Sequence, residues 1–77
     1  MIANRDDALG RLINFLRVER AKRGITQEQL AELVGVTRKT INTIERARFI
    51  PSTVLALRLA RAFRVRVEEL FRLEEER

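Results

Sequence analysis

Two helix-start signals with a glycine between them constrain the fold of this chain more than any other feature. Thr26 is followed three residues later by Gln29, which is the pattern of a capping box, and Thr37 offers a second N-cap. Gly35 lies between them, where a residue without a Cβ most easily takes a positive φ. The pattern predicts a short helix from Thr26 to Leu33, a turn of Val34-Gly35-Val36, and a second helix from about Thr37 to Arg46.

Apolar residues recur at helical spacing over most of the remaining chain. One stripe predicts a first helix that ends before Gly24, and it consists of Ala8, Leu9, Leu12, Ile13 and Leu16. Ser52, after the only proline, can cap a helix from about Thr53 to Phe63, and residues 67–71 are predicted as a short last helix. No run alternates apolar and polar residues as a half-buried strand would. We therefore expect an all-α fold of five helices.

The length of 77 residues supports one hydrophobic core and hence one domain over residues 1–77. Within it, residues 1–7 could form a flexible N-terminal extension, residues 1–13 could instead lengthen the first helix or form an arm, and residues 74–77 form an acidic tail. The chain has no Cys and no His, which removes disulfides, thiolate or imidazole metal sites and His-based acid–base catalysis. We expect no enzyme, no metal, no cofactor and, in a single small domain, no small-molecule effector. Without a long apolar run or a signal peptide, we expect a cytoplasmic protein that does not enter a membrane.

The positive charge is concentrated in the body of the chain. The sequence has 16 Lys and Arg against 11 Asp and Glu, a net charge of +5. Residues 1–67 carry 14 basic and 6 acidic groups, whereas residues 68–77 carry 2 basic and 5 acidic groups. Such a basic body attracts polyanions, of which nucleic acid is the commonest in a cell, although the same charge would also serve solubility alone.

Two short helices joined by a turn that contains glycine form a helix-turn-helix arrangement. If Val36, Ile41 and Ile44 are buried, the opposite face of the second helix presents donors without any acidic group. These are Arg38, Lys39, Asn42 and Thr43, with Arg46 one turn on and Gln27 at the start of the preceding helix. Arg and Lys suit guanine in a DNA major groove, and Asn suits adenine. The alternative is an ordinary solvated polar face.

The chain resembles the short, single-domain members of the Cro/cI-like (Xre-type) family of helix-turn-helix regulators. The resemblance covers residues 14–73 and is carried by Gly24-Ile25-Thr26-Gln27, Leu30-Ala31, Gly35-Val36-Thr37, Ile41-Asn42-x-Ile44-Glu45, Pro51-Ser52 and Glu68-Glu69-Leu70-Phe71. It implies a five-helix, lambda-repressor-like domain that binds double-stranded operator DNA at a palindrome as a homodimer. It places Gln27, Arg38, Lys39, Asn42 and Thr43 at bases, and Thr26, Thr37, Thr40, Arg46 and Arg48 near phosphates. It also implies an ion pair between Arg20 and Glu45.

The sequence departs from the family pattern at two helix ends. Many relatives have Asn-Gly after the glutamate of the second motif helix and Gly after the phenylalanine of the fourth helix. This chain has Arg46-Ala47 and Arg64 there. A left-handed cap without glycine is strained, so we expect these helices to run on or to end differently.

The fourth predicted helix is apolar around most of its circumference, which predicts burial on more than one side. We expect a dimer interface there and at the chain end, formed by Leu57, Phe63, Val65, Val67, Leu70, Phe71 and Leu73. Alternatively, the last helix covers the apolar surface of the fourth helix that the core leaves uncovered. A transcription regulator at the nucleoid is the function these features favour, and its acidic tail could contact RNA polymerase. An antitoxin, a restriction–modification controller, and a protein-interaction module that no longer binds DNA are the alternatives.

Overall fold

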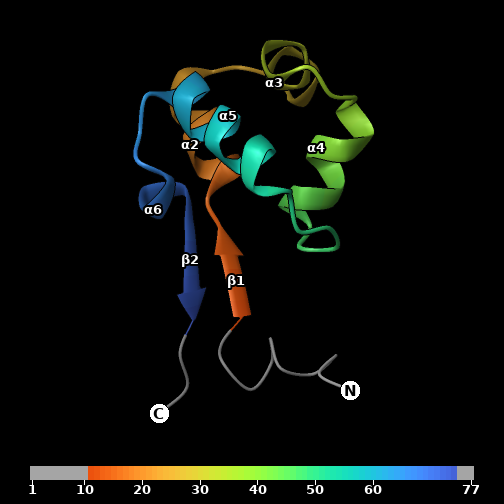
Figure 1. Ribbon diagram of the computed structural model, residues 1–77. Helices are drawn as coiled ribbons and strands as arrows, with labels where there is room; N and C mark the ends of the chain where they lie inside the picture. The colour runs from red at the N-terminus through yellow and green to blue at the C-terminus, as the bar shows by residue number, and fades with distance from the viewer. Residues whose placement is uncertain (1–10, 75–77) are drawn as a thin grey trace.

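The structure is a computed structural model that describes residues 11–74. Figure 1 shows helices gathered at one end and a two-stranded sheet extending from them. In chain order the elements are β1 (Arg11–Asn14), α2 (Leu16–Arg23), α3 (Gln27–Val34), α4 (Arg38–Glu45), α5 (Thr53–Phe63), α6 (Val67–Leu70) and β2 (Phe71–Glu74). The described part of the chain therefore has the five helices that the sequence predicts. None of these helices is long and apolar enough to cross a membrane.

The helix-start signals act as predicted. The Thr26 hydroxyl accepts from the Gln29 backbone N–H at 3.0 Å, and the Gln29 side chain accepts from the Thr26 N–H at 2.8 Å, which completes the capping box. Thr37 caps α4 through the backbone N–H of Thr40 at 3.2 Å. Gly35 has φ +78° and ends α3, so the turn between α3 and α4 depends on the residue without a Cβ.

A single core lies between the helices. Each helix contributes buried apolar side chains, and the set is Leu16, Leu30, Ala31, Val34, Ile41, Ile44, Leu55, Leu59, Ala60, Phe63 and Leu70. Burying one large apolar side chain contributes about 1.5–3 kcal/mol. Because Ile41 and Ile44 are the buried residues of α4, the core determines which face of this helix points outward.

The sheet corrects the prediction that the first helix extends back through Leu12 and Ile13. Residues 11–14 instead pair antiparallel with residues 71–74, in a register that sets Leu12 against Leu73 and Asn14 against Phe71. Asn14 helps to end the strand, because its amide donates to the Ile44 carbonyl at 2.9 Å and accepts from the Leu16 N–H at 3.3 Å. Ala8 and Leu9, the rest of the predicted stripe, lie outside the described residues, as do residues 1–7 and the acidic tail apart from Glu74.

The last predicted helix is also one residue shorter than expected. It ends at Leu70, and Phe71 is the first residue of β2. The backbone N–H of Phe15 donates to the Leu70 carbonyl at 2.9 Å, which joins the two chain segments where the sheet meets the helices. A strand partner about sixty residues away along the chain therefore decides the conformation of both segments.

The prediction that α4 and α5 run on or end differently from the family pattern is wrong. Each helix is followed by a non-glycine residue in the left-handed backbone conformation. Ala47 and Arg64 both have φ +60°. The N–H of Ala47 donates to Ile44 O at 2.9 Å, and the N–H groups of Arg64 and Val65 donate to Arg61 O and Ala60 O at 3.1 and 3.0 Å. Both helices therefore end at the positions where many relatives have glycine. The left-handed conformation costs a residue with a Cβ about 1–2 kcal/mol.

We expect Ala47→Gly and Arg64→Gly each to raise the free energy of unfolding by about 0.5–1 kcal/mol, because glycine removes the strain of the left-handed conformation. Chemical denaturation of each variant measures the change. Ala21→Gly is the matched control: it deletes the same methyl group as Ala47→Gly, but inside α2, and should lower stability by about 0.5–1 kcal/mol. Equal effects at residues 21 and 47 would contradict the strain argument.

Candidate nucleic-acid interface

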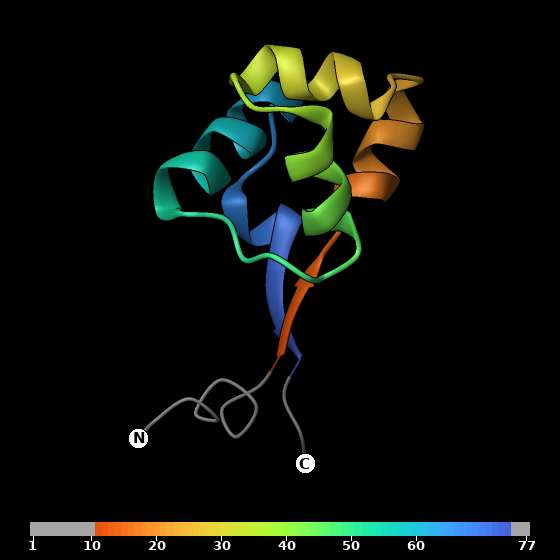
Figure 2. The same ribbon diagram turned by 90° about the vertical axis from the view of Figure 1, so that its right-hand side faces the viewer.

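The outward face of α4 carries the side chains that the sequence singled out. In Figure 2, α4 lies below α3 on the face of the domain that is turned toward the viewer. Arg38 and Lys39, in its first turn, are exposed, and Asn42 is half-buried. Thr43 is half-buried, and its hydroxyl donates to the Thr40 carbonyl of the same helix at 2.9 Å. The exposed positive charge is therefore concentrated at the N-terminal end of α4.

Gln27 joins this face from the first turn of α3. Its Nε2 lies 3.2 Å from Asn42 Oδ1 and 3.0 Å from Glu45 Oε1. Its Oε1 lies 3.4 Å from Nη1 of Arg38. The structure thus brings Gln27, Arg38 and Asn42 together across the two helices, and Lys39 and Thr43 lie outside this group.

The pair of Arg20 and Glu45 lies directly behind the group. Nε and Nη2 of Arg20 donate to Oε2 and Oε1 of Glu45 at 2.8 and 3.2 Å, and Nη1 donates to the Ile25 carbonyl at 3.0 Å. The ion pair that the family resemblance implied is therefore present, and it connects α2, the loop before α3, and α4. The Glu45 side chain is 0% exposed.

Glu45 stays ionised despite this burial. Burial alone raises the pKa of Glu45, but the hydrogen bonds from Arg20 and Gln27, together with the positive charges of Arg20 and Arg17, outweigh it and hold the pKa below its usual range. The hydrogen bond to Glu45 in turn raises the pKa of Arg20. Both groups therefore remain charged at neutral pH, and the Glu45 carboxylate can only accept hydrogen bonds.

The residues predicted to lie near phosphates are found at the N-terminal ends of α3 and α4 and in the loop after α4. The hydroxyls of Thr26 and Thr37 cap their own helices, and those of Thr37 and Thr40 lie 3.1 Å apart. Arg46 and Arg48 are exposed in the loop after α4, on either side of the left-handed Ala47. Whether these five residues contact phosphates stays a prediction.

Sequence reasoning missed two sets of ionic contacts made by α2. Arg17 is 68% exposed, and its Nε lies 3.6 Å from Glu45 Oε1. Glu19 is buried and accepts from Arg23 at 2.7 Å, which lowers the pKa of Glu19, while Arg23 Nη2 donates to the Phe63 carbonyl at 2.6 Å. The spacing of Glu19 and Arg23, four residues apart on a helix, was the available signal.

The expected dimer residues divide into three groups. Phe63 and Leu70 are 1% and 0% exposed within the core, so they are corrected: they cannot offer surface to a partner. Val65, Val67 and Phe71 are partly buried against the core. Leu57 and Leu73 are largely exposed, and Leu57 borders an apolar groove of about 280 Å³ whose lining is Leu12, Pro51, Thr53, Ala56, Leu57, Val67 and Phe71.

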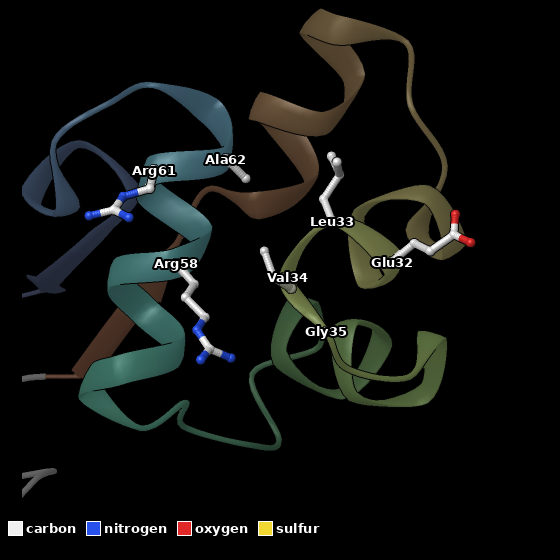
Figure 3. Close-up of a pocket in the computed structure, with 7 residues that line it drawn as sticks. All are labelled: Glu32, Leu33, Val34, Gly35, Arg58, Arg61 and Ala62. Atoms are coloured by element: carbon white, nitrogen blue, oxygen red, sulfur yellow. The ribbon is translucent and has the colours of Figure 1, made fainter.

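A second groove, of about 480 Å³, lies between α3 and α5 (Figure 3). Val34 and Ala62 point toward each other across it, whereas the charged groups of Glu32 and Arg61 extend away on opposite sides. Small-molecule sites instead bring a few polar groups together on the ligand. The surface formed by Gln27 and the outer face of α4 is therefore the stronger candidate site.

Comparison with known proteins shows the family of the chain. A family model described as Helix-turn-helix matches residues 16–70, from the start of α2 to the end of α6. The chain belongs to the Cro/cI-type helix-turn-helix family. This is a family of DNA-binding transcriptional regulators rather than enzymes, as the sequence predicted.

Relatives of similar length come from bacteria and archaea. The chain is 46% identical over 63 residues to the uncharacterised HTH-type transcriptional regulator YgzD of Bacillus subtilis, covering 82% of this chain and 96% of the relative. It is 50% identical over 63 residues to an uncharacterised HTH-type transcriptional regulator of Methanothermobacter thermautotrophicus, covering 80% and 91%. The family resemblance therefore extends over nearly the whole length of these proteins.

Two solved structures show the same fold. The restriction–modification controller protein C.AhdI of Aeromonas hydrophila matches with a TM-score of 0.69 and 39% identity, covering 73% of this chain and 85% of that one. The P22 c2 repressor, solved in complex with a synthetic operator, matches with a TM-score of 0.67 and 30% identity, covering 69% and 80%. Both support the five-helix, repressor-like fold class.

Removal of either partner of the buried pair should destabilise the domain strongly. We expect Arg20→Ala or Glu45→Ala to lower the free energy of unfolding by about 3–5 kcal/mol, because the remaining charge loses its partner in the interior. Thermal and chemical denaturation measure this loss. Arg17→Ala removes the exposed neighbour of Glu45 and should cost less than about 1 kcal/mol. A melting curve like that of the parent for either of the first two variants would refute the structural importance of the pair.

Proposed function

We propose that this protein binds operator DNA as a homodimer and regulates transcription with α4 of each subunit in the major groove. The observation that carries the proposal is the cluster of Gln27, Arg38 and Asn42, which presents hydrogen-bonding groups beside the exposed Lys39. Arg38, Lys39 and Asn42 suit the base edges of the major groove. The operator complex of the P22 c2 repressor, which has the same fold, supports this choice of ligand.

Backbone contacts would position the domain on the duplex. The N-termini of α3 and α4, with Thr26, Thr37 and Thr40, offer backbone N–H groups and hydroxyls to phosphates. Arg46 and Arg48 would add charge beyond the C-terminal end of α4. The protein would act in the cytoplasm, at the nucleoid, where its ligand is.

Dimerisation follows from the small size of one recognition surface. A single eight-residue helix offers few base contacts, whereas two subunits engage half-sites about 34 Å apart on one face of the duplex. Val54, Leu57 and Leu73 are exposed apolar side chains. Leu57 lines the groove bordered by Pro51 and Phe71, Val54 lines a smaller depression with Leu57, and Leu73 is the register partner of Leu12, which also lines the groove. We propose that this surface, without Phe63 and Leu70, contacts the second subunit.

A restriction–modification controller is the second candidate. The 39% identity to C.AhdI over 73% of this chain favours it over other specialised roles. The DNA-binding mechanism would be the same, and the neighbouring genes would distinguish the two: a controller lies beside a methyltransferase and an endonuclease.

Selection of bound duplexes from a random pool tests the function directly. We expect enrichment of a palindrome whose half-sites are centred about ten base pairs apart. Affinity for the selected duplex should fall steeply with salt, and Lys39→Ala should lower the slope of log affinity against log salt by about 1 if Lys39 neutralises one phosphate, or relax one base preference if it contacts a base. Absence of any enriched sequence would overturn the proposal in favour of a protein-interaction module.

The proposed dimer surface is tested by a charge in its centre. Leu57→Glu should give a monomer at micromolar concentration in light scattering, because it buries an unpaired carboxylate in the interface. Leu33→Glu changes a comparably exposed leucine on α3 and should leave the dimer intact. If both variants remain dimeric, the interface lies elsewhere; if the parent is a monomer, the dimer itself is refuted.

A further inference from the structure

The buried carboxylate of Glu45 determines the orientation of a neighbouring amide. An ionised carboxylate has only acceptors, so the Gln27 atom 3.0 Å from Glu45 Oε1 has to be the nitrogen Nε2. The amide of Gln27 therefore has a single orientation, with Nε2 toward Glu45 and Oε1 toward the guanidinium of Arg38. Arg38 can only donate, which fits the same orientation.

The fixed orientation of the Gln27 amide also determines the orientation of the Asn42 amide. Nε2 of Gln27 also lies 3.2 Å from the Asn42 side chain, where only an acceptor can receive its second proton. This atom is Oδ1, so Nδ2 occupies the other branch of the amide. Within residues 11–74, Nδ2 makes no hydrogen bond and no buried side-chain nitrogen or oxygen lacks a partner. Nδ2 is therefore accessible from outside the protein.

We propose that Glu45, acting through Gln27, is a positioning residue for base recognition: it holds Asn42 with a hydrogen-bond donor outward, so that the base pair facing Asn42 is preferentially guanine rather than adenine. The inference rests on the proposed function, because it concerns how the same surface distinguishes bases. It adds a role for Glu45 beyond its ion pair with Arg20.

The chemistry of the groove explains the preference. Guanine presents two acceptors, N7 and O6, to an amide NH2 group, whereas adenine presents one acceptor and one donor. The adenine pairing that an asparagine usually makes needs both Oδ1 and Nδ2 at the base edge. In this protein Oδ1 is directed at Gln27, so the usual pairing is disfavoured.

The experiment measures base preference at one operator position. The position is defined as the one whose preference is lost in Asn42→Ala, using duplexes that carry each base pair there in turn. For the parent we expect about tenfold tighter binding of guanine than of adenine, which is within the range of a single good base contact. Adenine preferred over guanine at this position would overturn the inference while leaving the proposed function intact; no enriched operator at all would overturn both.

Two variants interrupt the relay of hydrogen bonds from Glu45 through Gln27 to Asn42 at different points. Gln27→Met removes the amide and keeps the pair of Arg20 and Glu45, and Glu45→Gln replaces the pure acceptor by a group that can also donate. Each should reduce the ratio of guanine to adenine affinity to about twofold or less, an effect that loss of stability alone would not produce. Arg17→Ala, which removes a neighbour of Glu45 outside the relay, should keep the ratio of the parent. An unchanged ratio in Gln27→Met would overturn the inference.

A third variant replaces the outward donor of residue 42 by an acceptor and keeps the hydrogen bond from Gln27. In Asn42→Asp, one oxygen still accepts from Gln27 and the other faces the groove, so the preference should move from guanine toward cytosine, whose N4 donates. Combining Gln27→Met with Asn42→Ala should change the preference at this position no further than Asn42→Ala alone. A retained guanine preference in Asn42→Asp, or an additive effect in the double variant, would show that Asn42 does not transmit the constraint.

Discussion

The ion pair between Arg20 and Glu45 is the interaction on which the candidate site depends. A buried carboxylate is costly unless its oxygens are paired, and here two arginine donors and one amide donor satisfy them. Because Arg20 belongs to α2 and Glu45 to the end of α4, the pair fixes α4 against α2. The same carboxylate then orders the Gln27 amide. One side chain therefore links the packing of α2 against α4 to the arrangement of the candidate site.

The sequence predicted the features that local chemistry determines. The caps at Thr26, Thr37 and Ser52, the glycine at position 35 and the buried ridge of Ile41 and Ile44 are all present, because each depends only on residues within one helical turn. The helix-turn-helix arrangement follows from these signals alone. The candidate site follows in outline too, since the outward face of α4 is what remains when its ridge is buried.

Features that depend on distant partners were not predictable in this way. Leu12 and Ile13 fit a helical stripe, and only pairing with residues 72 and 73 makes them a strand. Phe63 and Leu70 look like surplus apolar surface until the packing of α5 and α6 places them in the core. At Ala47 and Arg64 the local preference opposes the observed left-handed backbone, and tertiary packing overrides it. The contacts among Gln27, Asn42 and Glu45 likewise require the two helices to be placed first.

The pairing of β1 with β2 joins the first and last elements of the described chain. Residues 11 and 74 are register partners, so the two ends of the described chain lie side by side (Figure 1). Closing a loop of this length costs chain entropy, although this cost grows only slowly with loop length. A two-stranded ladder alone is too weakly stable to offset it. The ladder is therefore expected to form after the helical core and to open before it. Residues 11–74 therefore form a nearly closed ring, and the ladder that closes it lies at the opposite end of the domain from the N-terminus of α4 (Figure 1). The ladder can open without breaking the hydrogen bonds among Gln27, Arg38 and Asn42, none of which involves a strand residue.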